Sequence, residues 1–257
     1  MLKNTWLHII LLSITVALSA CSTMSPSVSP ELQAKRVDTH YRLGIDALSK
    51  GNMPKAFKEL LHAESLNPNR SDVLGALGYA WQLRGNLDKA NAYYRRAIKH
   101  DPSPATYNNY GGLMLRMNKP NAAEKYFRKA LDNPRYRHPD IAYINLGDAL
   151  LLQDRFNEAI AAYRQARILN RFQETSRIRE AQAYVRYKRI TYAKALYETI
   201  LRDKPGNRQA LEGLLYLLRK EGNVSGVRKQ LEHFHRLTSD PLNKAWAEEE
   251  IKRLSDL

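Results

Sequence analysis

The chain has 257 residues, of which 44% are hydrophobic, and its 41 lysines and arginines exceed its 26 aspartates and glutamates, so the formal net charge is +15. One cysteine is present, Cys21, which excludes a disulfide within the chain. The excess of positive charge raises the question of an anionic partner, which would be nucleic acid, lipid or an acidic protein.

The N-terminal segment has the features of a targeting signal. Lys3 precedes a mostly apolar run from Trp6 to Leu18, which is shorter than the roughly 20 residues of a membrane-spanning helix. We therefore expect residues 1–20 to be a cleaved signal peptide. Leu18-Ser19-Ala20-Cys21 resembles the bacterial lipobox, which implies that Cys21 is lipidated and that Ser22 after it directs the protein to the periplasmic face of the outer membrane. The alternative is an ordinary signal peptide followed by an incidental cysteine.

Residues 21–36 are predicted to tether this anchor to a folded domain. Ser22 to Pro30 is rich in serine and proline and has no apolar periodicity, which is typical of a disordered linker. Glu31 to Arg36 is expected to begin to order against the first unit of the domain, which spans residues 37–257.

The segment from Ala76 to Pro102 contains a unit that recurs through the chain. Its Leu77-Gly78 pair, Gly85-Asn86 break and closing proline have the spacing of the tetratricopeptide repeat (TPR), a helix-turn-helix hairpin. With Gly78 as position 8, the same frame fits six units, 33 to 36 residues apart, that begin at Val37, Ser71, Pro104, Asp140, Glu174 and Arg208. Such units bury their apolar faces only against one another, so we predict an all-α TPR solenoid of six repeats, wound as a right-handed superhelix.

Four positions of the repeat have predicted packing roles. Positions 8 and 20 are expected to hold small residues where the two helices of a hairpin touch, and position 24 a large residue that fills the space beside them. Position 15 needs a left-handed backbone, so Asp154 and Lys188 there should be slightly strained. The small pairs are Gly44 with Ala56, Gly78 with Ala90, Gly111 with Ala123, Gly147 with Ala159, and Ala181 with Ala193; position 24 holds Leu60, Tyr94, Phe127, Tyr163, Tyr197 and Leu231; position 15 otherwise holds Gly51, Gly85, Asn118 and Gly222.

Two segments depart from this frame. Pro134 to Pro139 lengthens the connection between the third and fourth units, and it either splays them or, as we favour, forms a longer surface loop. Residues 242–255 are predicted to form a helix that caps the last repeat, where Leu215 and Val227 replace the small pair.

Positive charge concentrates between Arg167 and Lys194, where eight lysines and arginines accompany only Glu174 and Glu180. Export to the envelope excludes nucleic acid as the partner of this stripe. An acidic protein surface, anionic lipid or a merely solvated face remain as interpretations.

No catalytic, cofactor or metal site is predicted. The histidines from His40 to His235 are scattered, and His233 and His235 point to different sides of a helix. No HExxH, Gly-rich phosphate loop or Ser-His-Asp order occurs. We therefore expect a protein without enzymatic activity.

The first helix of each TPR hairpin lines a concave groove, in which this family holds peptides or partner helices. Positions 2, 5, 6, 9, 12 and 13 face inward and predict a groove lined by Tyr41, Ile45, Leu48, Tyr79, Asn108, Asn109, Asn145, Arg179 and Arg186. The first four would form an apolar floor, unless they pack on one another and on Glu31 to Arg36. The asparagine amides would hold the backbone of a partner.

The lipobox, the Ser/Pro tether and the six TPR units together resemble the PilF/PilW-type lipoproteins of type IV pilus biogenesis. Tyr41-Arg42-Leu43-Gly44, Asn108-Asn109-Tyr110-Gly111 and Ala142-Tyr143-Ile144-Asn145-Leu146-Gly147 add to the resemblance. It implies a monomeric outer-membrane pilotin that binds the secretin subunit, brings it to that membrane and promotes assembly of its multimeric pore. The alternative is a TPR lipoprotein adaptor that tethers an envelope peptidase or peptidoglycan synthase.

Overall fold

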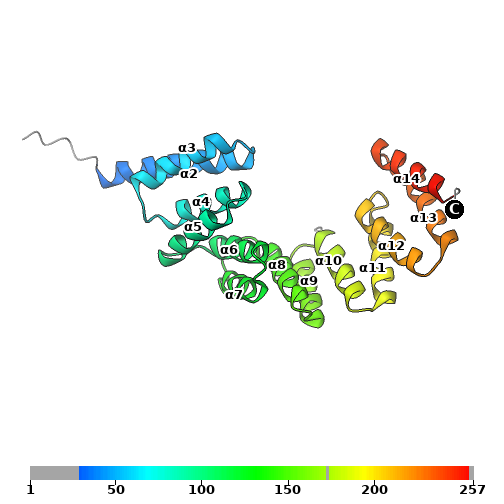
Figure 1. Cartoon of the computed structure of the whole chain (residues 1–257). Helices are drawn as coiled ribbons and strands as arrows, with labels where there is room; N and C mark the ends of the chain where they lie inside the picture. The colour runs from blue at the N-terminus through cyan, green and yellow to red at the C-terminus, as the bar shows by residue number, and fades with distance from the viewer. Residues whose placement is uncertain (1–28, 172–173, 255–257) are drawn as a thin grey trace, which may run out of the picture.

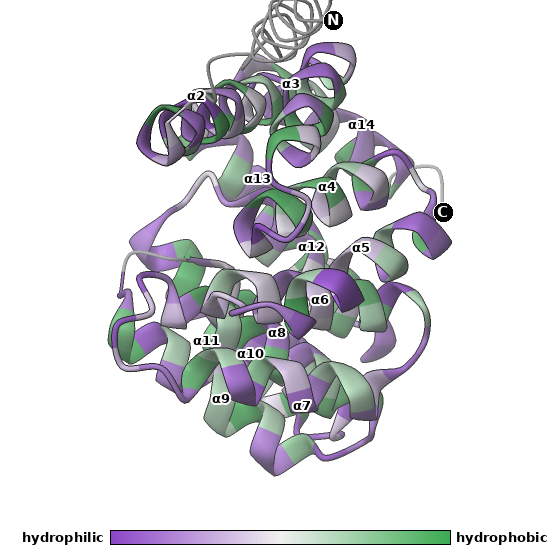
Figure 2. Ribbon diagram, turned by 90° about the vertical axis from the view of Figure 1, so that its left-hand side faces the viewer, coloured by the Kyte–Doolittle hydropathy of each residue, from purple (hydrophilic) through white to green (hydrophobic). Residues whose placement is uncertain are grey.

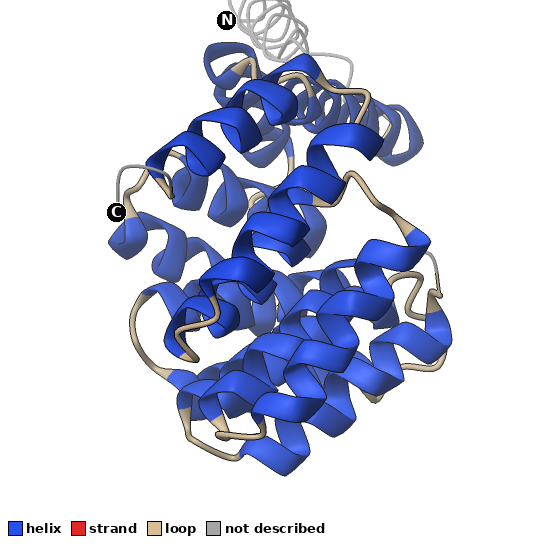
Figure 3. Cartoon of the chain, turned by 90° about the vertical axis from the view of Figure 1, so that its right-hand side faces the viewer, coloured by secondary structure: helices blue, strands red, loops and turns tan. Residues whose placement is uncertain are grey.

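The computed structural model describes residues 29–171 and 174–254, so the predicted signal peptide and Cys21 lie outside the described residues. Within those ranges the chain forms thirteen α-helices and no strand, which confirms the all-α prediction (Figure 3). The helices are α2 (Pro30–Ser49), α3 (Met53–Leu66), α4 (Ser71–Leu83), α5 (Leu87–Lys99), α6 (Pro104–Arg116), α7 (Pro120–Leu131), α8 (Pro139–Leu152), α9 (Phe156–Leu169), α10 (Glu174–Arg186), α11 (Ile190–Asp203), α12 (Arg208–Lys220), α13 (Val224–Leu237) and α14 (Pro241–Arg253). None of them has the length and hydrophobicity needed to cross a bilayer.

The helices pair in chain order into hairpins, from α2 with α3 to α12 with α13, and each hairpin packs on the next. Figure 1 shows the resulting arch, which descends from α2 and α3 to α9 and rises again to α14. The helices α4, α6, α10 and α12 begin at the residues where the frame starts a unit, and α8 begins one residue before such a start, at Pro139. The chain is therefore a TPR solenoid.

The first helix is longer than predicted. It begins at Pro30, so residues 30–36, assigned from sequence to the tether, are helical. Ser29 caps this helix, since its hydroxyl accepts the amide of Leu32 at 3.2 Å, and proline suits the first turn. The Gln33 side chain donates to the carbonyl of Leu66 at 2.8 Å, which ties the extension to the end of α3.

Every hairpin turn has a left-handed residue at the predicted position 15. The φ angles are 69° at Gly51, 82° at Gly85, 55° at Asn118, 56° at Asp154, 58° at Lys188 and 69° at Gly222. A side chain with a Cβ adopts this conformation at a cost of roughly 1 kcal/mol. The strain predicted at Asp154 and Lys188 is therefore present.

The glycines at position 8 serve a different contact from the one predicted. A Cβ added at Gly111 would lie 2.5 Å from Cε1 of Phe127, and one at Gly147 would lie 2.5 Å from Cε1 of Tyr163. The nearest atoms around Gly44 and Gly78 likewise belong to the large residue at position 24 of the same hairpin. Position 8 is small because the position 24 side chain of the same hairpin lies on it, so its nearest neighbour is this side chain and not the alanine at position 20, which is also buried.

The fifth repeat packs its position 24 side chain differently. Ala181 replaces the glycine at position 8, and the ring of Tyr197 lies instead where a Cβ on Gly213 of α12 would be. Both Ala181 and Tyr197 are buried, so the ring fills the space between the fifth and sixth repeats.

The hydrophobic core follows the whole length of the arch in two clusters. One includes Val37, Leu60 and Leu77, the other runs from Ala90 to Ala247, and Trp81 packs against both. In Figure 2 the hydrophobic residues gather where helices face one another and the loops are largely hydrophilic. The C-terminal helix α14 covers the last repeat, because the ring of Trp246 meets the ring of Phe234 edge-on at 5.9 Å. The link between the third and fourth repeats runs from residue 132 to residue 138, and α7 still packs against α8 across it. The link is therefore a longer loop that does not splay the two repeats.

Candidate partner-binding groove

The first helices of the hairpins line the inner side of the arch. Each contacts the first helix of the next repeat, from α2 with α4 to α10 with α12. In the described residues, the backbones of successive second helices lie farther apart than those of successive first helices, so the second helices are spread along the outer side. In Figure 1, α4 and α6 accordingly lie above α5 and α7.

The structure divides the predicted apolar floor into two kinds of residue. Ile45 and Tyr79 are exposed, with 39% and 38% of their surfaces accessible. Tyr41 and Leu48 are half-buried and pack against the N-terminal core cluster, and the Arg70 guanidinium lies 5.5 Å from the centre of the Tyr41 ring. Ile45 and Tyr79 are thus free to meet a partner, whereas Tyr41 and Leu48 support the fold beneath them.

Four further exposed apolar residues at inward positions were missed from sequence. They are Leu83, Ile141, Leu152 and Tyr216, which are exposed by 48%, 40%, 50% and 52%. They occupy positions 13, 2, 13 and 9 of the same frame, so reading the inward positions through every repeat would have found them. We call Ile45, Tyr79, Leu83, Ile141, Leu152 and Tyr216 the inner apolar stripe. Large exposed apolar side chains that recur on one face indicate an interaction surface.

The asparagines near the middle of the groove bond to one another. Asn108 is only 7% exposed, and its Oδ1 accepts a hydrogen bond of 3.0 Å from Nδ2 of Asn145. This bond joins α6 to α8. Asn109 is half-buried on the same helix as Asn108. The pair therefore stabilises the junction between repeats and has fewer free amide groups for a partner than the sequence indicated.

The two predicted groove arginines have partners in the preceding repeat. Arg179 Nε lies 3.6 Å from Asp148 Oδ1, and Arg186 Nη2 lies 2.7 Å from Asp154 Oδ1. Exposed pairs of this kind contribute at most about 1 kcal/mol. Asp148 also accepts a hydrogen bond of 2.8 Å from the Tyr163 hydroxyl, and burial raises its pKa above the ordinary value.

The basic stripe between Arg167 and Lys194 is largely paired within the chain. Besides the two arginines above, Arg167 lies 3.6 Å from Glu180, Arg177 2.8 Å from Asp203 and Lys194 2.8 Å from Glu221. Asp203 and Glu221 lie outside the range from Arg167 to Lys194, so a count of the charges within that range leaves their carboxylates out. The stripe is therefore an intramolecular ion-pair surface more than a free cationic patch.

Two histidines, His40 of α2 and His62 of α3, lie side by side in the first hairpin. His40 Nδ1 lies 2.7 Å from a carboxylate oxygen of Glu59, and the rings of His40 and His62 meet edge-on at 4.1 Å. No three histidine, cysteine, aspartate or glutamate side chains of residues 29–171 and 174–254 converge on one point as metal ligands would.

Comparison with known proteins agrees with this geometry. Models of the tetratricopeptide repeat match residues 71–104 and 113–174. The type IV pilus assembly protein PilF of Pseudomonas aeruginosa is 23% identical over 202 residues, which are 77% of this chain and 80% of PilF. The chain is a TPR protein homologous to PilF.

Two solved structures share its fold. One is a structure of Pseudomonas aeruginosa PilF, with a TM-score of 0.68 at 21% identity; the alignment covers 85% of this chain and 99% of the PilF chain. The other, of PilW, described as a widely conserved type IV pilus biogenesis factor, has a TM-score of 0.72 at 19% identity and covers 81% of this chain and 96% of its own. Both alignments extend over most of the solenoid, so the likeness is not confined to single repeats.

Proposed function

We propose that the protein is an outer-membrane lipoprotein pilotin of type IV pilus biogenesis, which binds the secretin subunit and promotes its targeting and multimerisation. The homology to PilF and the lipobox at Cys21 support this proposal. The observation that carries it is the inner apolar stripe, because a rigid solenoid with exposed apolar side chains on its concave face is suited to holding another protein.

The binding step follows from the burial of that stripe. An amphipathic segment of the secretin lies along α2 and α4, where it covers Ile45, Tyr79 and Leu83. Each square ångström of apolar surface removed from water contributes about 25 cal/mol. Acyl chains on Cys21 hold the groove at the membrane, and the bound subunit is thereby brought to the place where it assembles.

The groove is tested by Ile45→Asp and Tyr79→Asp. Each places a charge where the partner buries apolar surface, so capture of purified secretin subunit should weaken by roughly tenfold or more. Leu61→Asp is the matched control, because Leu61 is exposed by 42% but lies on α3, a second helix. Circular dichroism should be unchanged in all three variants. Equal capture by wild type and both groove variants moves the site elsewhere.

The anchor is tested separately by Cys21→Ala. We expect fewer secretin multimers in the outer membrane of cells that carry this variant, although the purified domain still binds the subunit. An unchanged amount and location of the pore removes the anchor from the mechanism. A deletion strain that keeps its secretin multimers and its twitching motility favours instead the adaptor for an envelope peptidase or peptidoglycan synthase.

A further inference from the structure

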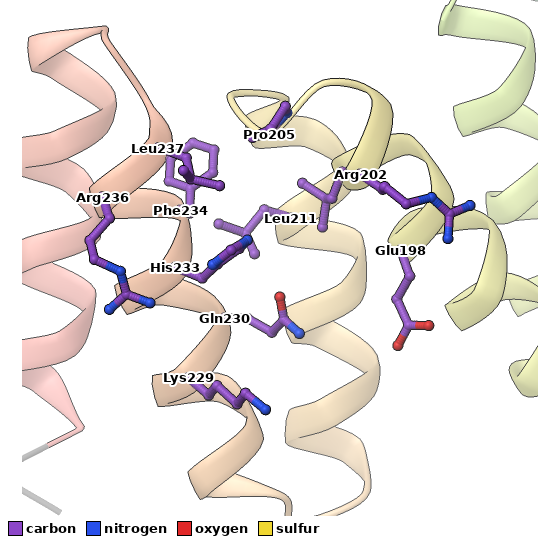
Figure 4. A pocket seen from close by; sticks show the side chains of 11 residues that line it. Glu198, Arg202, Pro205, Leu211, Lys229, Gln230, His233, Phe234, Arg236 and Leu237 are labelled. Carbon is purple, nitrogen blue, oxygen red and sulfur yellow. The ribbon is translucent and has the colours of Figure 1, made fainter.

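A crevice on the outer side of the arch separates the second helices of the last two repeats. It lies between α11 and α13, above the N-terminal turn of α12, and has a volume of about 420 Å³ (Figure 4). Its apolar lining comes from Leu201, Pro205, Leu211, Phe234 and Leu237. The inner apolar stripe is on the first helices, so this crevice is a separate surface.

The last repeat lacks the side chains that bridge the same place in the second repeat. There, the hydroxyl of Tyr93 donates to Glu64 of α3 at 3.1 Å, and Arg96 pairs with the same carboxylate at 2.6 Å. The equivalent positions of α13 hold Gln230 and His233, and they face Leu201 where α3 has Glu64. Among the described residues that line the opening, no ion pair or hydrogen bond joins a side chain of α11 to one of α13.

Unpaired positive charge surrounds the opening. Arg202, Lys229 and Arg236 are exposed, and none of them makes an ion pair with a described residue. This differs from the basic stripe of the fourth and fifth repeats, whose cations largely have carboxylate partners. Glu198 is the acidic residue among those that line the crevice.

We propose that this crevice binds an acidic peptide segment through one large apolar side chain. The apolar side chain enters between Phe234 and Leu201, and the flanking carboxylates of the segment face the three rim cations. The volume lies within the usual range of small binding pockets. A peptide fits better than an anionic membrane surface, because the apolar floor is recessed and Glu198 would repel lipid phosphates while it accepts a backbone N–H from a peptide.

The experiment uses a displayed library of random dodecapeptides, from which those that bind the purified protein are selected. Peptides that also bind a rim variant, Lys229→Glu with Arg236→Glu, are then removed. We expect the remaining peptides to combine aspartates or glutamates with one phenylalanine, tryptophan or leucine. A labelled peptide from this pool should bind the rim variant at least tenfold more weakly than the wild type.

Two further variants separate the crevice from general charge effects. Lys99→Glu with Lys125→Glu makes the same change of charge on α5 and α7 and should leave the binding of that peptide within about twofold. Gln230→Tyr restores the side chain found at this position in the second and third repeats, closes the opening without a change of charge and should abolish binding.

Three outcomes overturn the proposal. The first is a remaining pool with no excess of acidic residues, or no peptide left after depletion on the rim variant. The second is equal loss of binding in the control pair. The third is binding of phosphatidylglycerol vesicles that depends on Lys229 and Arg236 without any peptide that does so, which assigns the rim to the membrane.

Discussion

Gly111→Ala tests the packing rule that holds each hairpin together. The glycine is at position 8 of the third repeat, and the added methyl would lie 2.5, 2.7 and 2.9 Å from three carbons of the Phe127 ring. Ordinary carbon contacts are about 3.5–4.0 Å, so the ring has to move by about 1 Å. Phe127 is fully buried, with 0% of its surface exposed, and has no solvent-filled space to enter.

The expected magnitude is a difference between two opposing effects. Overpacking of this kind costs about 1–3 kcal/mol. Alanine is favoured over glycine within a helix by about 1 kcal/mol. Gly111→Ala should therefore lower the free energy of unfolding by up to about 2 kcal/mol, or leave it nearly unchanged at the lower limit of the overpacking cost.

The neighbouring residue supplies the control that resolves this range. A Cβ added at Gly112, on the same helix, meets no atom within 4 Å, so Gly112→Ala should gain up to about 1 kcal/mol from helix propensity alone. Urea unfolding followed by circular dichroism measures both variants. Gly111→Ala should be about 1–3 kcal/mol less stable than Gly112→Ala, and Phe127→Leu should cost less in the Gly111→Ala background than in wild type. Equal stability of the two alanine variants would refute the reasoning.

Three other changes should alter stability in defined directions. Lys188→Gly should raise the free energy of unfolding by about 1 kcal/mol, because Lys188 has a φ of 58°, which glycine adopts without strain. Lys188→Ala keeps a Cβ and should therefore not raise the midpoint temperature of thermal unfolding. Burial opposes ionisation of Glu124, but hydrogen bonds from Gln153, Arg128 and Arg155 outweigh it and lower the pKa of this carboxyl. Glu124→Gln should therefore lower the free energy of unfolding at pH 7, and urea titrations should show this difference from wild type disappearing as the pH falls below about 4. Burial raises the pKa of Asp148, so the folded state binds the proton more tightly than the unfolded chain, and the wild type loses stability as the pH rises through that pKa. The free energy of unfolding of Asp148→Asn relative to wild type should therefore increase from pH 3 to pH 7, and a difference that does not change with pH would contradict the assignment.

The repeat period predicts the backbone well because each unit repeats the same local physics. Helix starts such as Ser71 and Pro104, and the left-handed turn at Lys188, follow from the frame alone. The start of α2 was predicted too late because no turn residue separates Pro30 from Val37, and the frame marks where a repeat begins and not where its helix begins.

Contacts between repeats could not be read from the same pattern. A repeat frame says which face a residue occupies, but the side-chain conformation decides its neighbour. Tyr197 thus packs on Gly213 of the next repeat, and Asn108 bonds to Asn145 across a junction. The exposed residues of the groove can be predicted from the sequence if the inward positions of every repeat are considered, which adds Tyr216.

The outer crevice could not be predicted from the repeat pattern, because it is marked by side chains that one repeat lacks. Gln230 has the polarity of an ordinary surface residue in the sequence, and its significance is visible only beside Tyr93 at the same position of another repeat. Composition is likewise a poor guide to free charge, because most cations between Arg167 and Lys194 are paired whereas Lys229 and Arg236 are not.

Site-specific photo-crosslinking in living cells tests the proposed function most directly. The photoreactive residue p-benzoylphenylalanine is placed at position 79, on the concave face, or at position 61, on α3, where the native side chains have similar exposures of 38% and 42%. If the concave face holds the secretin subunit, irradiation should join the two proteins covalently at position 79 and not at position 61. An adduct with the secretin at position 61 alone, or at neither position while secretin multimers assemble normally, would contradict the account.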